Sequence, residues 1–154
     1  MKKLLYLLPL FLLMSCNQNA LYQGMYRDFE DNRWFKLDSK TFEFDVNEDV
    51  ANARIIIKFS HVYEPYYNNV PIEVVIKKQG GESETIKTTM FLKDKKGKDI
   101  SDCLGDICDL DFMLKENYPF RKGKYSITIA NTVNTTYLPN VIGLGLEVER
   151  LPGE

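Results

Sequence analysis

The segment Ile142-Gly143-Leu144-Gly145-Leu146-Glu147-Val148-Glu149 alternates large aliphatic residues with glycine or glutamate. Successive side chains of a β-strand point to opposite faces of a sheet, so the four aliphatic side chains share one face. The small and charged residues share the other face. A strand of this kind buries one face in a core and turns the other toward water, as in an antiparallel sheet.

Five other runs have the same period of two, and they lie at Phe42–Val46, Ile55–Phe59, Ile72–Ile76, Ile86–Leu92 and Tyr125–Ile129. The breaks between runs contain turn residues, namely Asn47-Glu48-Asp49, Glu64-Pro65, Gly80-Gly81, Lys96-Gly97, Lys122-Gly123 and Pro139-Asn140. Leu110, Phe112 and Leu114 predict one more strand, and we expect it to pair with the Thr85–Leu92 run. The pattern predicts an all-β chain, a single antiparallel β-sandwich of about seven or eight strands, Ig-like or jelly-roll-like.

The N-terminus has the features of a bacterial lipoprotein signal peptide covering residues 1–15. Lys2 and Lys3 precede an apolar run from Leu4 to Met14, too short to span a bilayer, which takes about 20 residues. The run closes on Leu13-Met14-Ser15-Cys16, and acyl chains attached to Cys16 would bury enough methylenes to hold the chain on a membrane. The alternative is an ordinary secretory signal followed by a chance cysteine.

Cleavage before Cys16 leaves 154 − 15 = 139 residues, enough for one domain with its own core. We expect a lipidated N-terminus and tether over residues 16–32 and the sandwich over residues 33–154. Removal of two lysines makes the net charge (20 − 2) − 22 = −4 with His61 neutral. A mildly acidic chain without a basic block is a poor candidate for binding nucleic acid.

Beyond Cys16 the chain has two cysteines, Cys103 and Cys108. A single pair in an oxidising compartment favours a disulfide, which would close a loop of only four residues and stabilise the fold modestly. Two free thiols are the alternative. Two thiols without a nearby histidine are half of a zinc site, so we predict no metal and no cofactor.

Catalytic groups are sparse, and we predict no enzyme activity. The one histidine, His61, stands at a predicted strand end, where a surface position is the ordinary expectation. The acidic residues between Asp94 and Asp111 do not match the spacing of an EF-hand loop, and lysines lie among them. We therefore interpret that segment as a solvated loop rather than a calcium site.

Aromatic residues gather between two predicted strands, at His61-Val62-Tyr63-Glu64-Pro65-Tyr66-Tyr67. Together with Trp34, Tyr63, Tyr66 and Tyr67 form a candidate binding surface, because exposed aromatics are efficient contact residues. They could stack on a sugar or form hot spots against a protein. Alternatively, the tyrosines cap the open end of the core.

The order of features along the chain resembles the GldH family of gliding-motility lipoproteins. The matching pieces are the lipoprotein signal, Tyr26 to Phe29 with Trp34, Phe42 and Phe44, Tyr66 with Asn68-Asn69-Val70, Phe91-Leu92-Lys93-Asp94 with Gly97-Lys98, Gly105-Asp106, Gly123-Lys124-Tyr125, and Leu138 to Glu149. Asp99-Ile100 replaces an expected tryptophan, Ala130-Asn131-Thr132-Val133 departs from the usual pattern, and Cys103 and Cys108 are peculiar to this chain. The resemblance is therefore that of a divergent member.

The resemblance implies a non-enzymatic cell-envelope lipoprotein that serves gliding motility or the secretion machinery linked to it. Its expected partners are the lipid bilayer, through lipidated Cys16, and other envelope proteins. Asn17-Gln18-Asn19 carries no acidic run that would favour surface export, so we expect the outer membrane, on its periplasmic side. The alternative function is a carbohydrate-binding surface lipoprotein that uses the exposed aromatics.

Overall fold

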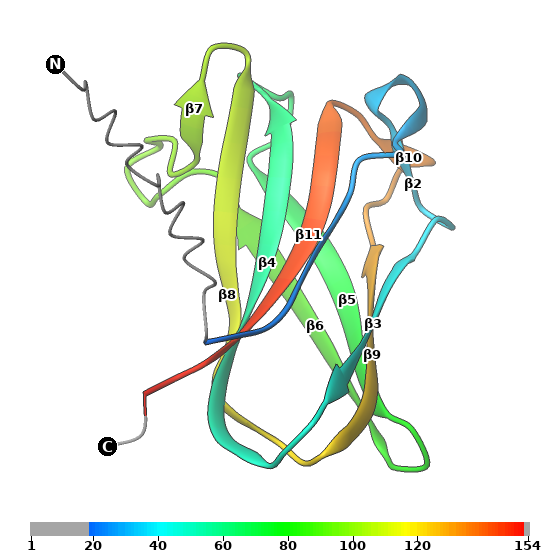
Figure 1. The fold of residues 1–154 in the computed structure, drawn as a ribbon. Helices are drawn as coiled ribbons and strands as arrows, with labels where there is room; N and C mark the ends of the chain where they lie inside the picture. Colours follow the sequence, from blue (N-terminus) through cyan, green and yellow to red (C-terminus); the bar gives the residue numbers. More distant parts are fainter. Residues whose placement is uncertain (1–18, 153–154) are drawn as a thin grey trace, which may run out of the picture.

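The computed structural model describes residues 19–152 as an all-β chain (Figure 1). Eight strands are seven or more residues long: β1 Ala20–Tyr26, β3 Lys40–Val46, β4 Val50–Val62, β5 Asn69–Lys78, β6 Ser83–Phe91, β8 Ile107–Phe120, β9 Gly123–Asn131 and β11 Val141–Arg150. The short elements are η1 Glu30–Asn32, a 3-10 helix, and strands β2 Trp34–Phe35, β7 Asp102–Leu104 and β10 Tyr137–Leu138. The predicted fold class is confirmed. No helix within residues 19–152 is long and apolar enough to cross a membrane.

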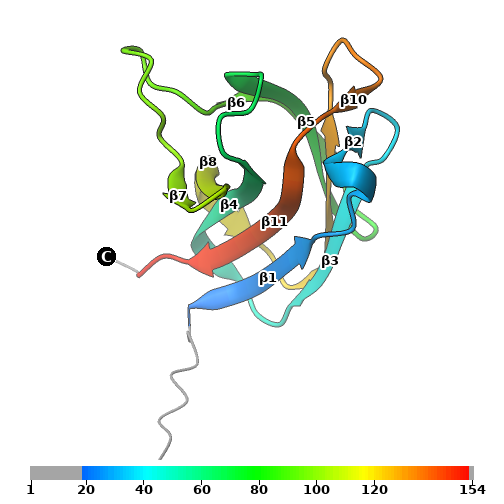
Figure 2. The same ribbon diagram turned by 90° about the horizontal axis from the view of Figure 1, so that it is seen from above.

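Two antiparallel sheets form the layers of the sandwich (Figure 2). The first sheet has the order β1-β11-β4-β8-β7, and the second sheet has the order β3-β9-β5-β6. β2 and β10 form a separate small ladder. Among the eight long strands, the first, eighth, third and sixth lie in one sheet, and the second, seventh, fourth and fifth lie in the other. This is the order of a jelly roll rather than of an Ig domain.

The strand containing Leu110 and Phe112 exists, but its predicted partner was wrong. β8 pairs with β4, where Leu110 lies opposite Phe59, whereas β6 pairs with β5. Alternation shows which face of a strand is buried and says nothing about which strand lies beside it. In the jelly roll the chain crosses to the other sheet between β6 and β8, so the two strands become neighbours across the layers.

The core lies between the sheets and contains the aliphatic face of β11. Leu144, Leu146 and Val148 are fully buried there. On the outer face of the same strand, Glu147 forms an ion pair with Lys58 at 2.8 Å, and Glu149 forms one with Arg54. The alternation that predicted the strand therefore separates core packing from a ladder of ion pairs across neighbouring strands.

The sandwich begins earlier than the expected boundary at residue 33. β1 pairs with β11 from Ala20 to Tyr26, so residues 20–26 belong to the first sheet. The Tyr26 hydroxyl donates to the carbonyl of Thr41 at 2.6 Å and joins the edges of the two sheets. Cys16 and the predicted signal peptide lie outside the described residues.

We call the end of the sandwich where β1 begins and β11 ends the proximal end, and the opposite end the distal end (Figure 1). At the proximal end the amide of Arg150 donates to the carbonyl of Asn19 at 2.7 Å. At the distal end the amide of Val62 donates to the carbonyl of Asn140 at 3.0 Å, and that of Tyr63 donates to Asp106 at 2.9 Å. A chain segment of thirteen residues, β4, spans the distance between the ends, about 40 Å at about 3.3 Å per residue.

Candidate functional site

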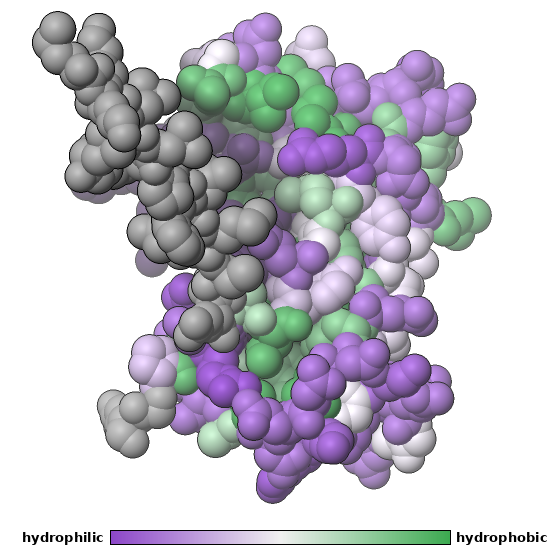
Figure 3. All heavy atoms as spheres, viewed as in Figure 1, coloured by the Kyte–Doolittle hydropathy of each residue, from purple (hydrophilic) through white to green (hydrophobic). Residues whose placement is uncertain are grey.

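Exposed apolar side chains concentrate at the distal end. The ten large hydrophobic residues with the most exposed side chains in the described part of the chain include eight at or near this end: Phe35, Leu37, Tyr63, Tyr66, Phe91, Ile100, Leu104 and Ile107. The other two, Met25 and Met113, lie on the outer face of the first sheet. Figure 3 shows hydrophobic surface gathered along the top of one face of the molecule. Concentrated exposed apolar surface marks interaction sites on soluble domains.

The loop between β4 and β5 supplies the aromatic part of this end. Tyr66 is 95% exposed and Tyr63 is 50% exposed. Tyr67 is half-buried beside the core, and its hydroxyl is buried without a hydrogen-bond partner within the described residues. Burial raises the pKa of Tyr67 well above its ordinary value. Tyr67 therefore caps the core, whereas Tyr63 and Tyr66 face solvent.

Trp34 does not belong to the exposed surface, and its predicted place there was wrong. Its side chain is fully buried, with the ring packed edge-on against Phe29 at 6.2 Å between centroids. The indole N–H donates to the carbonyl of Asp38 at 2.7 Å, so its polar atom is satisfied inside the fold. The four predicted aromatics thus divide into two exposed and two packed residues, and they form no single platform.

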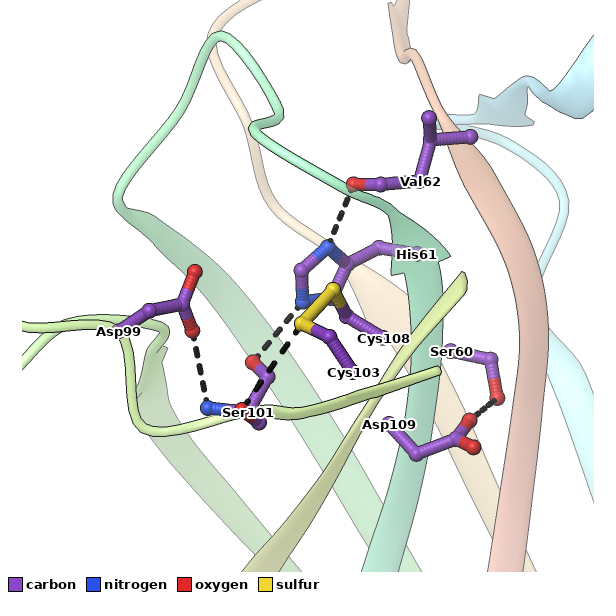
Figure 4. Close-up of a disulfide and its surroundings, with 8 residues drawn as sticks. All are labelled: Ser60, His61, Val62, Asp99, Ser101, Cys103, Cys108 and Asp109. Carbon is purple, nitrogen blue, oxygen red and sulfur yellow. Dashed lines mark hydrogen bonds between the residues drawn. A yellow bond between two sulfur atoms is a disulfide. The ribbon is translucent and has the colours of Figure 1, made fainter. Parts of the chain in front are cut away.

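A disulfide hairpin lies next to the aromatic loop. Cys103 of β7 lies directly opposite Cys108 of β8, and a disulfide joins them, with their Cα atoms 4.0 Å apart (Figure 4). Gly105 forms the turn with φ of +62°, a conformation that favours glycine. Leu104 at the tip is 90% exposed, and Ile107 is 46% exposed. The hairpin therefore holds two aliphatic side chains out toward solvent.

His61, near the end of β4, is hydrogen-bonded to the segment that precedes this hairpin. Its ring is fully buried, not on the surface as the sequence suggested, and it stacks on Phe59 at 5.7 Å between centroids. Nδ1 lies 2.9 Å from the carbonyl oxygen of Val62, and Nε2 lies 2.9 Å from the hydroxyl of Ser101 (Figure 4). A carbonyl oxygen can only accept, so Nδ1 carries the proton and Nε2 accepts from Ser101.

The acidic residues near the hairpin organise turns. Asp94 accepts from the amides of Lys96 and Lys98, at 2.8 and 2.9 Å, and Asp99 accepts from the amide of Ser101 at 2.9 Å. Within residues 19–152 no group of three histidine, cysteine or acidic side chains is placed to hold a metal ion. These carboxylates shape the backbone that supports the distal end.

An open hollow of about 470 Å³ lies on the outer face of the second sheet, near the proximal end. Its lining includes Glu43, Asp45, Lys77 and Lys124, so it contains both acidic and basic side chains. Tyr63 and Tyr66 are not among the residues that line it.

The sequence pointed to Tyr63 and Tyr66 but missed Leu104, Ile107, Ile100 and Phe91. One signal for Leu104 and Ile107 was available: both flank the turn Gly105-Asp106 between two cysteines, where polar residues are usual. Phe91 also had a signal, because it lies between Met90 and Leu92 and so on the opposite face of the alternating run. Ile100 gave none, because it lies in a segment without a clear period.

A profile described as GldH lipoprotein matches residues 22–148, most of the chain. No curated protein sequence matches. Among solved structures, the chain is similar to Eiger TNF from S. frugiperda, with 9% identity and a TM-score of 0.39 over 73% of this chain and 66% of that one. It is also similar to dimeric latent PorU from Porphyromonas gingivalis, with 8% identity and a TM-score of 0.34 over 86% of this chain and 13% of that one.

The profile match spans the strands from β1 to β11, including both cysteines of the hairpin and the whole distal end. A match over most of the sequence identifies the family even though the chain departs from its usual pattern at several positions. The chain belongs to the GldH lipoprotein family.

Proposed function

We propose that this protein is a lipid-anchored, non-enzymatic component of the gliding-motility or linked secretion machinery, and that it works by binding other envelope proteins through its distal end. Membership of the GldH lipoprotein family supports the envelope setting and the membrane anchor. The observation that carries the mode of action is the concentration of exposed apolar side chains at one end of the sandwich.

The position of the anchor explains why that end would be available. Cys16 is the proposed lipidation site, and Asn17-Gln18-Asn19 connects it to the start of β1 at Ala20. Four residue steps reach at most about 14 Å, so the proximal end would lie close to the bilayer. The distal end would then point away from the membrane, about one strand length further out, toward proteins of the periplasm.

The composition of the distal end fits a protein partner. Tyr66 and Leu104 are the most exposed of its side chains apart from Leu37, and they come from two loops joined by the hydrogen bond between Tyr63 and Asp106. Protein interfaces favour an apolar centre rich in aromatic residues such as tyrosine, surrounded by a polar rim. The lysines and aspartates of residues 93–99 supply charge at this end, since Leu92 before them is bonded to Asn68 and Ser101 after them to His61.

Complementation of a deletion strain tests the proposal. Leu104→Gln and Tyr66→Gln should impair gliding or secretion and reduce co-purification of envelope proteins, because each removes an exposed contact side chain. Met113→Gln is the matched control, since Met113 is also exposed but lies on the outer sheet face. If both distal variants restore movement and secretion as fully as the wild-type gene, the distal end is not the working surface.

Carbohydrate binding is the second candidate, supported by the exposure of Tyr63 and Tyr66 in one loop. A glycan array with the purified chain, and with Tyr63→Ala and Tyr66→Ala variants, distinguishes the two functions. Glycan binding that both substitutions abolish would favour the carbohydrate-binding function. An array without signal would exclude that function.

A further inference from the structure

We infer that β6 is a docking edge on which an extended segment of another protein adds as a further strand of the second sheet. This inference goes beyond the proposed function, because it concerns a different surface and a different kind of contact. It rests on four features of β6: its place in the sheet, its regular pairing, its unpaired backbone groups and the half-buried side chains beside it.

β6 is the last strand of the second sheet and pairs on one side only, with β5. The nine residue pairs from Asn69 opposite Phe91 to Lys77 opposite Ser83 follow one register without a bulge. The opposite edge of that sheet, β3, is different, because Tyr26 of β1 donates to its Thr41 carbonyl. Natural edge strands are commonly protected by charged side chains, a bulge, a proline or a covering segment. β6 carries Glu84 and Lys87 but has none of the other three within the described residues.

The hydrogen bonds that are present identify the backbone groups of β6 that point away from β5. The amide of Leu92 donates to the carbonyl of Asn68, and the two residues lie on the same register as the β5–β6 ladder. Hydrogen-bonded pairs alternate along an antiparallel ladder, so every second residue from Leu92 back along β6 faces β5. The others face the free edge and offer their N–H and C=O groups outward: Ser83, Thr85, Lys87, Thr89 and Phe91.

The bonding between β5 and β9 supports this assignment independently. The amide of Thr132 donates to the carbonyl of Pro71, which continues the β5–β9 register. Pro71 therefore faces β9, and its neighbours Val70 and Ile72 face β6. This agrees with the alternation deduced from Leu92, and within residues 19–152 no other element hydrogen-bonds to the free edge. Five donors and five acceptors in regular spacing fit the backbone of an extended strand.

The space beside this edge is apolar. Ile86 of β6 and Phe112 and Leu114 of β8 pack against the core but remain partly exposed. Near the proximal end this side of the sandwich is closed by the ion pair between Glu84 and Lys115 at 2.7 Å. An added strand would place alternate side chains over Ile86 and Phe112, so apolar residues at every second position are the chemistry that fits.

The charge of Lys87 favours a different protein over a second copy of this chain as the occupant of the β6 edge. Two copies of β6 that pair antiparallel over their whole length would place Lys87 directly opposite Lys87, and like charges in that position are destabilising. Lys87 forms an ion pair with Glu73 of β5 at 3.2 Å but remains 78% exposed, so its ammonium can also pair with an acidic side chain from the incoming strand. We therefore assign the edge to an extended segment with alternating apolar residues and an acidic residue facing Lys87.

A proline at the free edge tests this directly. Thr89→Pro removes an outward N–H without removing a bond to β5, a position where edge strands accept proline. Thr89→Ala keeps the N–H and is the matched control. With tagged full-length protein purified from native membranes, we expect Thr89→Pro to lose about tenfold of the bound envelope protein, the effect of one lost hydrogen bond, and Thr89→Ala to keep it.

Hydrogen exchange on the wild-type complex gives a readout that does not depend on the variant folding. Amides of residues 83–91 should exchange more slowly in the complex than in the chain purified alone. If Thr89→Pro retains as much envelope protein as the wild type, or if exchange of residues 83–91 is unchanged in the complex, the inference is overturned. Neither result bears on the proposal that the distal end binds a partner. Protection of residues 83–91 in a dimer of the purified chain also overturns it, because the occupant would then be a second copy.

Discussion

Ser101 donates its hydroxyl hydrogen to Nε2 of His61 across 2.9 Å, from a loop that lies forty residues further along the chain. The bond joins the end of β4 to the segment that leads into the disulfide hairpin. Because His61 also donates through Nδ1 to the carbonyl of Val62, both ring nitrogens are engaged inside the fold. The single histidine of this protein therefore positions a loop of the distal end.

Removing the Ser101 hydroxyl should loosen that loop. Ser101→Ala leaves Nε2 of the buried imidazole without its donor, and we expect the free energy of unfolding to fall by about 1–2 kcal/mol. Urea unfolding measures the loss, and hydrogen exchange should show faster opening of residues 99–104. Asp102→Ala, a change at the exposed neighbour, is the control and should have little effect. Equal stability of the two variants would contradict the role given to His61.

Tyr67→Phe should leave stability at neutral pH unchanged or raise it, by up to about 1 kcal/mol. The Tyr67 hydroxyl is buried without a partner in the described structure, so its removal relieves a desolvation cost and breaks no bond. Thermal unfolding of both proteins measures the difference. A loss of more than about 1 kcal/mol would mean that the hydroxyl does have a partner.

The same variant should also alter the response to alkali. Burial raises the pKa of Tyr67 in the folded state above the ordinary value of 10.0, so the folded protein holds this proton more tightly than the unfolded chain. Stability from this source is present below pH 10 and is lost as the pH rises further. Tyr67→Phe should therefore lose less stability than the wild type between pH 9 and 11, roughly the range around the unfolded tyrosine pKa.

The disulfide should contribute modestly to stability. The loop between Cys103 and Cys108 holds four residues, and the chain-entropy relation gives about 2 kcal/mol for a loop this short. We expect Cys103→Ala/Cys108→Ala to remain folded and to lose about that amount in urea unfolding. Thiol labelling of the unfolded wild-type protein without reductant should give no signal from either cysteine. Labelling of both would show that the pair is reduced in the cell.

Gly145→Ala should be poorly tolerated, because a methyl group there would have no room. An added Cβ would lie 3.0 Å from the carbonyl oxygen of Gly24 and 3.1 Å from Cβ of Lys58. We expect a loss of about 1–3 kcal/mol, the usual cost of overpacking. Gly81→Ala is the control, since its nearest neighbour would lie 3.4 Å away. A Gly145→Ala protein as stable as Gly81→Ala would mean that β1 and β4 do not pack this closely around β11.

Much of the fold could be read from the sequence because alternation reports burial residue by residue. Leu144, Leu146 and Val148 and the turns at Gly80-Gly81 and Lys122-Gly123 lie where the pattern predicted. At the start of β11 Val141 enters the core in place of Ile142, because the pairing with β4 shifts register between Val141 and Gly143. The pairing of β8 with β4 could not be deduced, because an alternating strand has the same pattern beside any neighbour. β1 lies in the segment that the sequence predicts to be a tether, because its mixture of tyrosine, glycine and glutamine shows no clean period.

The distal end was predictable only in part, for a similar reason. Tyr66 stands in a loop rich in turn residues, and its exposure follows from that setting. Trp34 looked equally suited to a surface, but its burial depends on the packing of Phe29 and on the carbonyl of Asp38, which the sequence alone does not place. Exposure of a single aromatic residue is a property of the packed fold rather than of its local sequence.

The position of the contact surface can be measured by site-specific photo-crosslinking in native cells. A photoreactive residue is placed singly at Tyr66 or Leu104 in the distal end, at Met113 on the sheet face, and at Glu48 near the proximal end. We predict crosslinks to another envelope protein from Tyr66 and Leu104 and none from Met113 or Glu48. Crosslinks from Glu48 or Met113 in the absence of any from the two distal positions would contradict the proposal that the distal end binds the partner.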